Sequence, residues 1–261
     1  LIENPGFLSG GATRWYRDTL LKIDDYNVMT LLASKSPIGS NGVIFLPCMQ
    51  GAMTPTWNGN ARGTFTGLTP SHTFEDMTRS VFEGISFGLR DNIDRFEELG
   101  MDCSSIRMVG GATKGPFWCQ MKADLLGKSI TATKSAEGAA IGAAMLASVA
   151  EGNFANLDEA AEVMVELGAT YIPDPSKKAA YDDAYGKYLE CYKAMEPFFN
   201  KVYKVFYGCG SIFFHEFDCK LATVFHNYFN HFVHFLFLSS IRIFLYILRL
   251  LLCVRSLLPH L

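Results

Sequence analysis

Residues 108–127, "MVGGATKGPFWCQMKADLLG", decide the fold predicted for this sequence. The apolar run that ends at Val109 suits a short strand. Gly110 and Gly111 follow, and glycine can adopt positive φ and let a ligand approach the bare backbone. Pro116 then fits the first turn of a helix, where its missing N–H costs nothing. The stretch therefore predicts a strand, a glycine turn and a helix.

The glycine turn can hold a ligand or merely reverse the chain. A helix N-terminus offers unpaired N–H groups and the positive end of a dipole to an anion. However, the stretch has no G-x-G-x-x-G pattern, and Lys114-Gly115-Pro116 is not the G-K-[ST] of a P-loop. From the residues alone, both interpretations stay open.

A long helix is predicted between Thr73 and Gly100. Thr73 is the expected N-cap, and Asp76 stands in the capping-box position three residues later. Apolar residues recur every three or four positions along this stretch. Gly84 and Gly88 lie one turn apart within it, and each disfavours the helix by about 1 kcal/mol. Close packing against a neighbouring element is the expected compensation.

The other predicted elements complete an α/β order. Residues 42–49, 61–69 and 129–134 have strand-like patterns, and residues 135–152 form a helix crowded with alanine and glycine. Tight packing of this helix against a neighbour is expected; the alternative is that its N-terminal end, Glu137–Ala140, faces a ligand. Four tyrosines at helical spacing predict a packed face on a later helix: Tyr181, Tyr185, Tyr188 and Tyr192. This order predicts a layered α/β domain.

Composition excludes some functions. The 261-residue chain has a net charge of -3 and no basic stripe, so nucleic-acid binding has no electrostatic support. Its seven cysteines show no C-x-x-C pairing, which argues against zinc and favours reduced thiols in a cytoplasmic protein. The first residues show neither the basic region nor the apolar region of a signal peptide.

The composition changes near residue 205. Residues 205–261 are rich in Phe and His, and residues 232–252 form an apolar run that Arg242 and Arg249 interrupt. Because arginine is costly at mid-bilayer, a membrane span is disfavoured. The cysteines and histidines of this tail have no known metal-site spacing. The favoured interpretation is an extension outside the native fold, such as a misread reading frame.

Several stretches resemble one family, the FGGY carbohydrate kinases, and within it the xylulokinase-like branch. Residues 63–83, "GTFTGLTPSHTFEDMTRSVFE", fit the family's second signature, including Gly67-Leu68, Asp76-Met77 and Ser80-Val81-Phe82-Glu83. The run "IRMVGGATKGPFWCQMKADLLG" is similar to the family's adenosine-binding turn and the helix after it. The resemblance covers about residues 7–200.

This resemblance implies the C-terminal actin-like, RNase H-like α/β domain of a sugar kinase. The implied reaction moves the γ-phosphate of ATP, with Mg²⁺, to a hydroxyl of a sugar or polyol substrate. The family's glycine turn contacts the nucleotide, which points to Gly110, Gly111 and Ala112. Lys114 and Gly115 are lesser candidates, and Gly115 stands where relatives often carry Ser or Asn.

The resemblance also implies that part of the kinase is missing. The sugar site, the first phosphate loop and the general-base aspartate lie upstream in this family. We therefore expect no catalytic residue and no metal site in this chain, and an N-terminal kinase domain as its partner. Asp76 and Glu83 are interpreted as structural. Residues 51–55 lack the Glu-Arg pair of many relatives, so the sugar stays open.

The predicted organisation is a kinase C-terminal domain over residues 1–204, truncated at its start, followed by an atypical apolar tail over residues 205–261. Three alternatives remain: a non-catalytic actin-like nucleotide-binding module, a membrane-tethered protein, and a mispredicted gene fragment. A homodimer is also left open.

Overall fold

The computed structural model describes residues 9–52 and 57–203, and the chain divides into two units, Leu1–Lys201 and Val202–Leu261. The elements described below belong to the first unit. The predicted apolar tail, residues 205–261, lies outside the described residues, and so does part of the run at residues 51–55.

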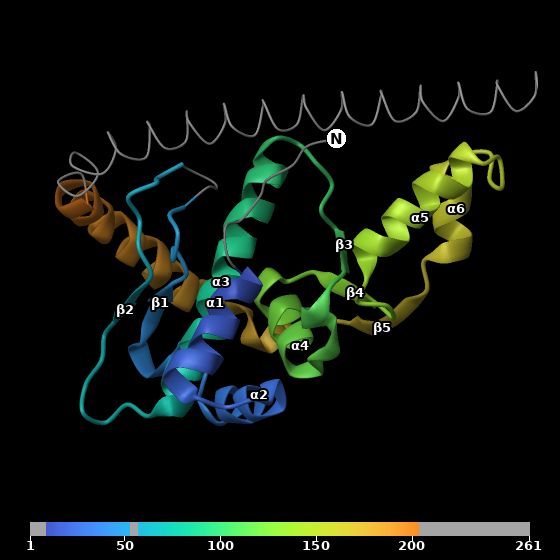
Figure 1. Ribbon diagram of the computed structural model, residues 1–261. Helices are drawn as coiled ribbons and strands as arrows, with labels where there is room; N and C mark the ends of the chain where they lie inside the picture. Colours follow the sequence, from blue (N-terminus) through green and yellow to red (C-terminus); the bar gives the residue numbers. More distant parts are fainter. Residues whose placement is uncertain (1–8, 53–56, 204–261) are drawn as a thin grey trace, which may run out of the picture. The chain divides into compact units, whose positions relative to one another are not determined.

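Helices and short strands alternate along the first unit (Figure 1). The helices are α1 (Ser9–Trp15), α2 (Tyr26–Lys35), α3 (Phe74–Glu98), α4 (Pro116–Leu126), α5 (Gly138–Ala150) and α6 (Leu157–Met164), and residues 178–201 are also helical. The strands are β1 (Ile44–Leu46), β2 (Thr64–Thr66), β3 (Ser105–Met108), β4 (Ser129–Thr133) and β5 (Leu167–Tyr171). The order confirms the predicted mixed α/β class.

Helix α3 is the central element of the core, and it begins as predicted. The Thr73 N–H donates to Asp76 Oδ2 at 3.2 Å, which is one half of a capping box. The helix packs against α2, α4 and β1. Its buried apolar side chains are Val81, Phe82, Ile85, Phe87 and Ile93.

The expected close packing holds at one of the two glycines of α3. A Cβ on Gly84 would lie 2.1 Å from the carbonyl oxygen of Phe45, so β1 crosses the helix where no side chain fits. A Cβ on Gly88 would meet only the Tyr188 hydroxyl, at an ordinary 3.8 Å. Gly84 therefore sets the distance between α3 and the small antiparallel sheet of β1 and β2.

The tyrosine face of residues 178–201 also packs as predicted. Tyr181, Tyr185 and Tyr188 are buried, and the Phe87 ring lies 5.8 Å from Tyr185 and 5.4 Å from Tyr188 between centroids. Tyr192 is half-buried. Since Phe87 belongs to α3, this stripe joins the late helix to the core.

A second sheet has the strand order β3-β4-β5. Strands β3 and β4 are parallel and α4 connects them, whereas β5 returns antiparallel to β4. The carboxyl ends of β3 and β4 therefore lie at the same edge of the sheet. Turns that follow these two strands are brought together there, and this edge holds the candidate site.

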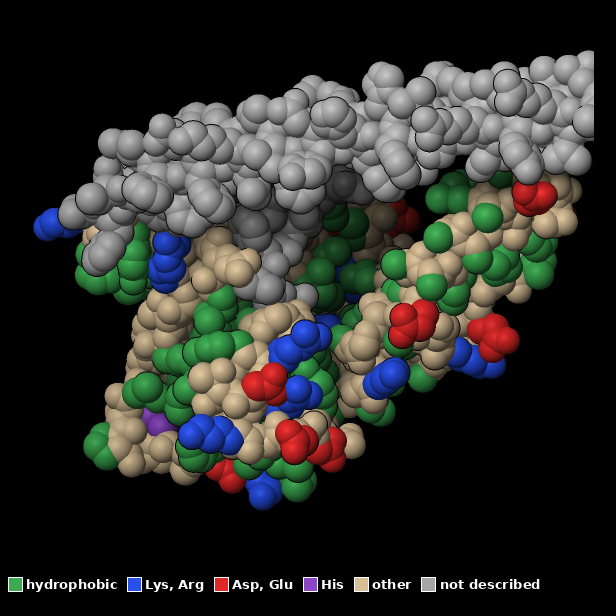
Figure 2. All heavy atoms as spheres, in the orientation of Figure 1, with side chains coloured by type: hydrophobic (Ala, Val, Ile, Leu, Met, Phe, Trp, Pro, Cys, Tyr) green, Lys and Arg blue, Asp and Glu red, His purple; other side chains and the backbone are tan. Residues whose placement is uncertain are grey.

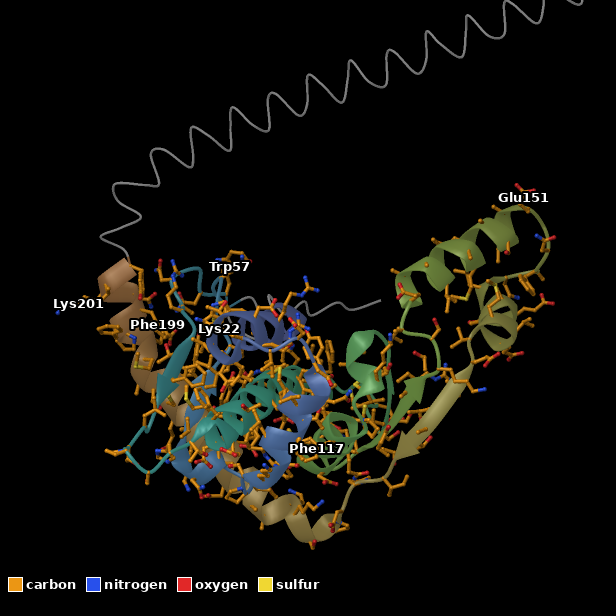
Figure 3. All side chains as sticks on the ribbon, turned by 60° about the horizontal axis from the view of Figure 1, so that its bottom comes forward. Lys22, Trp57, Phe117, Glu151, Phe199 and Lys201 are labelled. Carbon is orange, nitrogen blue, oxygen red and sulfur yellow. The ribbon has the colours of Figure 1, made fainter. Side chains whose placement is uncertain are left out.

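Helix α5 packs closely on one side only: it contacts α6, and a Cβ on Gly138 would lie 2.2 Å from Val109 Cγ1. Helix α5 contacts α6, yet none of its side chains is buried. Leu146 is 60% exposed, and Val163 of α6 is 66% exposed. Figure 2 shows hydrophobic side chains along the visible face of this pair, and Glu151 follows at the end of α5 (Figure 3). The small residues permit the close approach to α6 and Val109, while the rest of the α5 surface stays exposed.

Within residues 9–52 and 57–203, no helix combines the length and the apolar character needed to cross a bilayer.

The two glycines of α3 give a matched test of this packing. We expect Gly84→Ala to destabilise the chain by about 1–3 kcal/mol, because the new methyl group would overlap the Phe45 carbonyl. Gly88→Ala has room, and it should raise stability by up to about 1 kcal/mol through helix propensity. Urea unfolding followed by circular dichroism measures both. Equal effects of the two changes would contradict the close approach at Gly84.

Candidate functional site

The glycine turn after β3 contains one strained residue. Gly110 has φ 101° and ψ −178°, a region that is essentially closed to residues with a side chain. Gly111 does not use the positive φ that glycine permits, because it begins the 3-10 helix η3 (Gly111–Lys114). Only Gly110 is therefore required by the turn itself.

Hydrogen bonds hold the turn in shape and attach it to α4. The Thr113 N–H and hydroxyl both donate to the Gly110 carbonyl, at 3.0 and 2.8 Å. The fully buried Cys119 thiol donates to the Ala112 carbonyl at 3.5 Å. Burial raises the pKa of Cys119, so the thiol keeps the proton that it donates. The turn is thus a fixed part of the β3–α4 connection.

The outer side of the turn is open. Gly111 and Lys114 are exposed, Ala112 is half-buried, and a Cβ on Gly111 would meet nothing within 4 Å. Gly115 is the N-cap of α4 and forms no side-chain cap. The first N–H groups of α4 have no acceptor within their own helix. An anionic ligand can therefore approach the turn and the start of α4 without meeting side chains at Gly111 or Gly115.

A cavity of about 510 Å³ lies beside the turn, at the carboxyl ends of the two parallel strands. Val109 lines it from the end of β3, and Gly138 lines it from the N-terminus of α5. Its other lining residues are Thr133, Lys134, Ser135, Ile141, Met145, Met164, Val165 and Glu166. Ligands in open α/β sheets commonly bind at this edge.

The structure therefore brings together the glycine turn and the N-terminal end of α5, which were considered as separate candidates from the sequence. The predicted residues Gly110, Gly111, Ala112, Lys114 and Gly115 lie on one turn. The N-terminal end of α5, offered as an alternative ligand contact, borders the adjoining cavity.

Two residues that line this cavity, Thr133 and Ser135, were not predicted from the sequence. The Thr133 hydroxyl donates to the Ser135 carbonyl at 2.7 Å and lies 3.5 Å from the Met108 carbonyl. The bond to Met108 ties β4 to the end of β3. A parallel β3–β4 pair predicted from the strand-helix-strand order would have identified this region.

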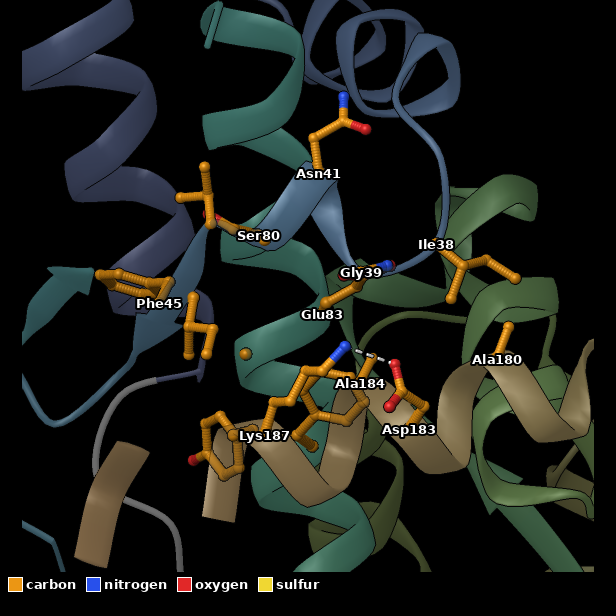
Figure 4. A pocket seen from close by; sticks show the side chains of 16 residues that line it. Ile38, Gly39, Asn41, Phe45, Ser80, Glu83, Ala180, Asp183, Ala184 and Lys187 are labelled. Atoms are coloured by element: carbon orange, nitrogen blue, oxygen red, sulfur yellow. Dashed lines mark hydrogen bonds and ion pairs between the residues drawn. The ribbon is translucent and has the colours of Figure 1, made fainter. Parts of the chain in front are cut away.

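A second pocket, of about 210 Å³, lies between residues 38–45, α3 and the late helix (Figure 4). Its charged groups have partners within the protein. The Lys187 ammonium lies 2.6 Å from Asp183, and Glu83 is bound by Arg79 Nε at 2.7 Å. Because these charges are already neutralised, the pocket offers little to a charged ligand.

Asp76 and Glu83 have the structural roles that their positions predicted. Asp76 accepts hydrogen bonds from Ser36 Oγ at 2.7 Å and Asn41 Nδ2 at 2.8 Å. Burial alone would raise the pKa of Asp76. These two hydrogen bonds and the one from the Thr73 N–H outweigh burial, so the pKa lies below its usual value. For Glu83, burial raises the pKa, and the Arg79 guanidinium opposes the shift. Both carboxylates hold the segment before β1 onto α3.

Comparison with known proteins identifies the class. Residues 7–151, more than half of the chain, match the C-terminal domain of the FGGY family of carbohydrate kinases. The chain is 32% identical over 185 residues to the xylulose kinase of Staphylococcus epidermidis, covering 71% of this chain and 37% of that protein. It therefore belongs to the FGGY family and corresponds to a C-terminal part of a xylulokinase-like member.

Solved structures agree with this assignment. Gluconate kinase from Lactobacillus acidophilus has a TM-score of 0.66 and 31% identity, over 74% of this chain and 39% of that one. Plasmodium falciparum glycerol kinase with ADP has a TM-score of 0.58 and 26% identity, over 70% of this chain and 36% of that one. The chain thus spans little more than a third of the length of these relatives.

Two alanine substitutions separate the strained glycine from the open one. Gly110→Ala should lower the free energy of unfolding by about 1–3 kcal/mol, because alanine disfavours the Gly110 backbone conformation. Gly111→Ala should change it by less than about 0.5 kcal/mol, since its Cβ site is empty. Thermal unfolding of both variants gives the comparison. A larger loss at Gly111 than at Gly110 would show that the turn geometry is misassigned.

Proposed function

We propose that this chain supplies the nucleotide-binding part of an ATP-dependent carbohydrate kinase. The observation that carries the proposal is the open glycine turn beside a cavity, in a chain of the FGGY family. Gly111 and Ala112 would contact the nucleotide through their backbone, and Gly110 would hold the turn in the required shape. Lys114 and Gly115 border the same approach.

The proposed ligand fits the chemistry of this edge. Exposed N–H groups and the positive end of the α4 dipole favour a phosphate. The apolar side chains of α5 and α6 that line the cavity suit the flat, weakly polar surface of a purine. A solved relative with ADP supports nucleotide use in this family.

We further propose that the kinase reaction needs polypeptide beyond this chain. Phosphoryl transfer requires a nucleophile, a γ-phosphate and Mg²⁺ held in one arrangement. Since the matched part covers 37% of the xylulose kinase, we expect the rest of the kinase to complete this arrangement and the chain alone to be inactive.

The bare face of α5 and α6 supports an upstream partner. Leu146, Leu157 and Val163 are 60%, 46% and 66% exposed, and large exposed apolar surfaces usually mark an interface. The relatives extend far beyond the matched part, since it covers 37% of the xylulose kinase. We propose that the missing part of the kinase covers this face, and that residues 205–261 are not needed for this unit to fold.

The acceptor is proposed only as a sugar or polyol. The relatives include kinases of xylulose, gluconate and glycerol, and this range supports a sugar or polyol as the class of acceptor without naming one compound. A non-catalytic nucleotide-binding module is the second candidate. The same turn and cavity would serve it, and only the upstream sequence distinguishes the two.

Gly111→Val tests the nucleotide contact. The valine side chain would occupy the open side of the turn, and we expect ADP affinity to fall at least about tenfold, or about 1.4 kcal/mol. The melting temperature should change little, because the protein leaves that space empty. Isothermal titration of the purified chain with ADP, alongside thermal unfolding, gives both values. Unchanged affinity together with a large drop in melting temperature would mean that the glycine only serves the turn.

A further inference from the structure

Lys122 of α4 is a buried charge with no carboxylate partner among the described residues. Lys122 is 7% exposed. In the part of the chain that the structure describes, no Asp or Glu oxygen lies closer than 4.0 Å to its ammonium. The other buried charges are satisfied differently: Arg79 pairs with Glu83, and Asp124 with Lys177. An unpaired buried ammonium destabilises a fold, so its presence needs an explanation.

The contacts of Lys122 connect it with the strand that leads into the glycine turn. Nζ lies 3.6 Å from Met108 Sδ, and Met108 ends β3 two residues before Gly110. Nζ also lies 4.0 Å from the centroid of the Trp118 ring, one helical turn earlier. A cation over an aromatic face gains about 2 kcal/mol when desolvated, which compensates only part of the burial cost.

The Trp118 ring that carries the ammonium is itself fixed. It stacks on Phe82 with centroids 4.7 Å apart and an interplanar angle of 10°, and its Nε1 donates to Ser86 Oγ at 3.0 Å. Because both partners belong to α3, the core holds the ring in place. The lysine head group is therefore held at the end of β3 rather than free to reach solvent.

We propose that Lys122 supplies positive charge behind the glycine turn and so favours the phosphates of a bound nucleotide. The proposal rests on the proposed nucleotide function of that turn. A charge acts more strongly where water is excluded, and the low exposure of Lys122 meets that condition. Lys122 is thus a positioning residue that acts on the ligand through its field.

The protonation of Lys122 gives the proposal a second readout. Burial lowers the pKa of Lys122 to about 8, and the neighbouring Cys119 acts in the opposite direction. Cys119 also contacts Tyr171 of β5 through a hydrogen bond. The residues that reach the ammonium from β3 and through the Trp118 ring from α3 are uncharged. The lysine charge is present below pH 8 and is lost as the pH rises through that value.

The test compares ADP with adenosine on the full chain. Lys122→Met removes the charge and keeps the length of the side chain; we expect ADP to bind about fivefold more weakly or worse at pH 7. Adenosine, which has no phosphate, should bind within about twofold of the unchanged chain. Lys122→Arg should keep most of the ADP affinity, and Lys35→Met, at an exposed position on α2, should have no effect.

Melting temperature and pH separate this role from a merely structural one. The methionine variant should unfold at the same temperature as the original chain or higher, because it no longer buries a charge. ADP affinity of the original chain should fall between pH 7 and pH 9, as the lysine loses its charge. If Lys122→Met does not fold, the pH series on the original chain still decides.

Three outcomes would overturn the proposal. The first is unchanged ADP affinity in Lys122→Met, and the second is an equal loss for ADP and adenosine. The third is ADP affinity that stays constant from pH 7 to pH 9. If the original chain bound neither ADP nor adenosine, the nucleotide function itself would fail, and this inference with it.

Discussion

The structure depends on the buried ion pair between Arg79 and Glu83, one turn apart on α3. Arg79 Nη2 donates to the Tyr181 hydroxyl at 2.9 Å, which ties α3 to the late helix. Glu83 accepts from the Gly39 N–H at 3.2 Å and from Ser40 Oγ at 3.0 Å. That segment has positive φ at four successive residues, 39–42, and strain of this kind persists only where its surroundings enforce it. One pair of side chains thus connects the segment before β1, the central helix and the last helix of the unit.

Much of this core could be predicted from sequence because it depends on local patterns. The capping box at Thr73, the tyrosine stripe and the helix start at Pro116 each follow from residues close together in the chain. The backbone conformation of Gly111 could not be predicted, because a glycine marks conformational freedom without showing whether the chain uses it. Helices α1, α2 and α6 and strand β5 were not predicted from the sequence. Helices α2 and α6 are short, and contacts with distant parts of the chain stabilise such helices more than their own sequence patterns do.

The candidate site was predicted in part for the same reason. The five residues of the turn follow from one stretch, whereas the cavity arises because parallel pairing places the ends of β3 and β4 together. Lys122 could not be singled out from its place in α4, because only the tertiary structure shows that Trp118 and Met108 enclose its ammonium. The close approach predicted for α5 is present at α6 and Val109, but no sequence pattern indicated that the rest of its surface stays exposed.

We propose that this unit binds nucleotide at an ordered turn and that phosphate transfer needs polypeptide beyond this chain. The most direct test is phosphorus NMR of the purified chain with ATP, Mg²⁺ and a pentulose, since one spectrum reports both binding and turnover. We predict that the ATP resonances shift or broaden in proportion to protein concentration, and that no sugar phosphate or ADP accumulates. Sugar-dependent formation of ADP, or ATP resonances unaffected by the protein, would contradict the account.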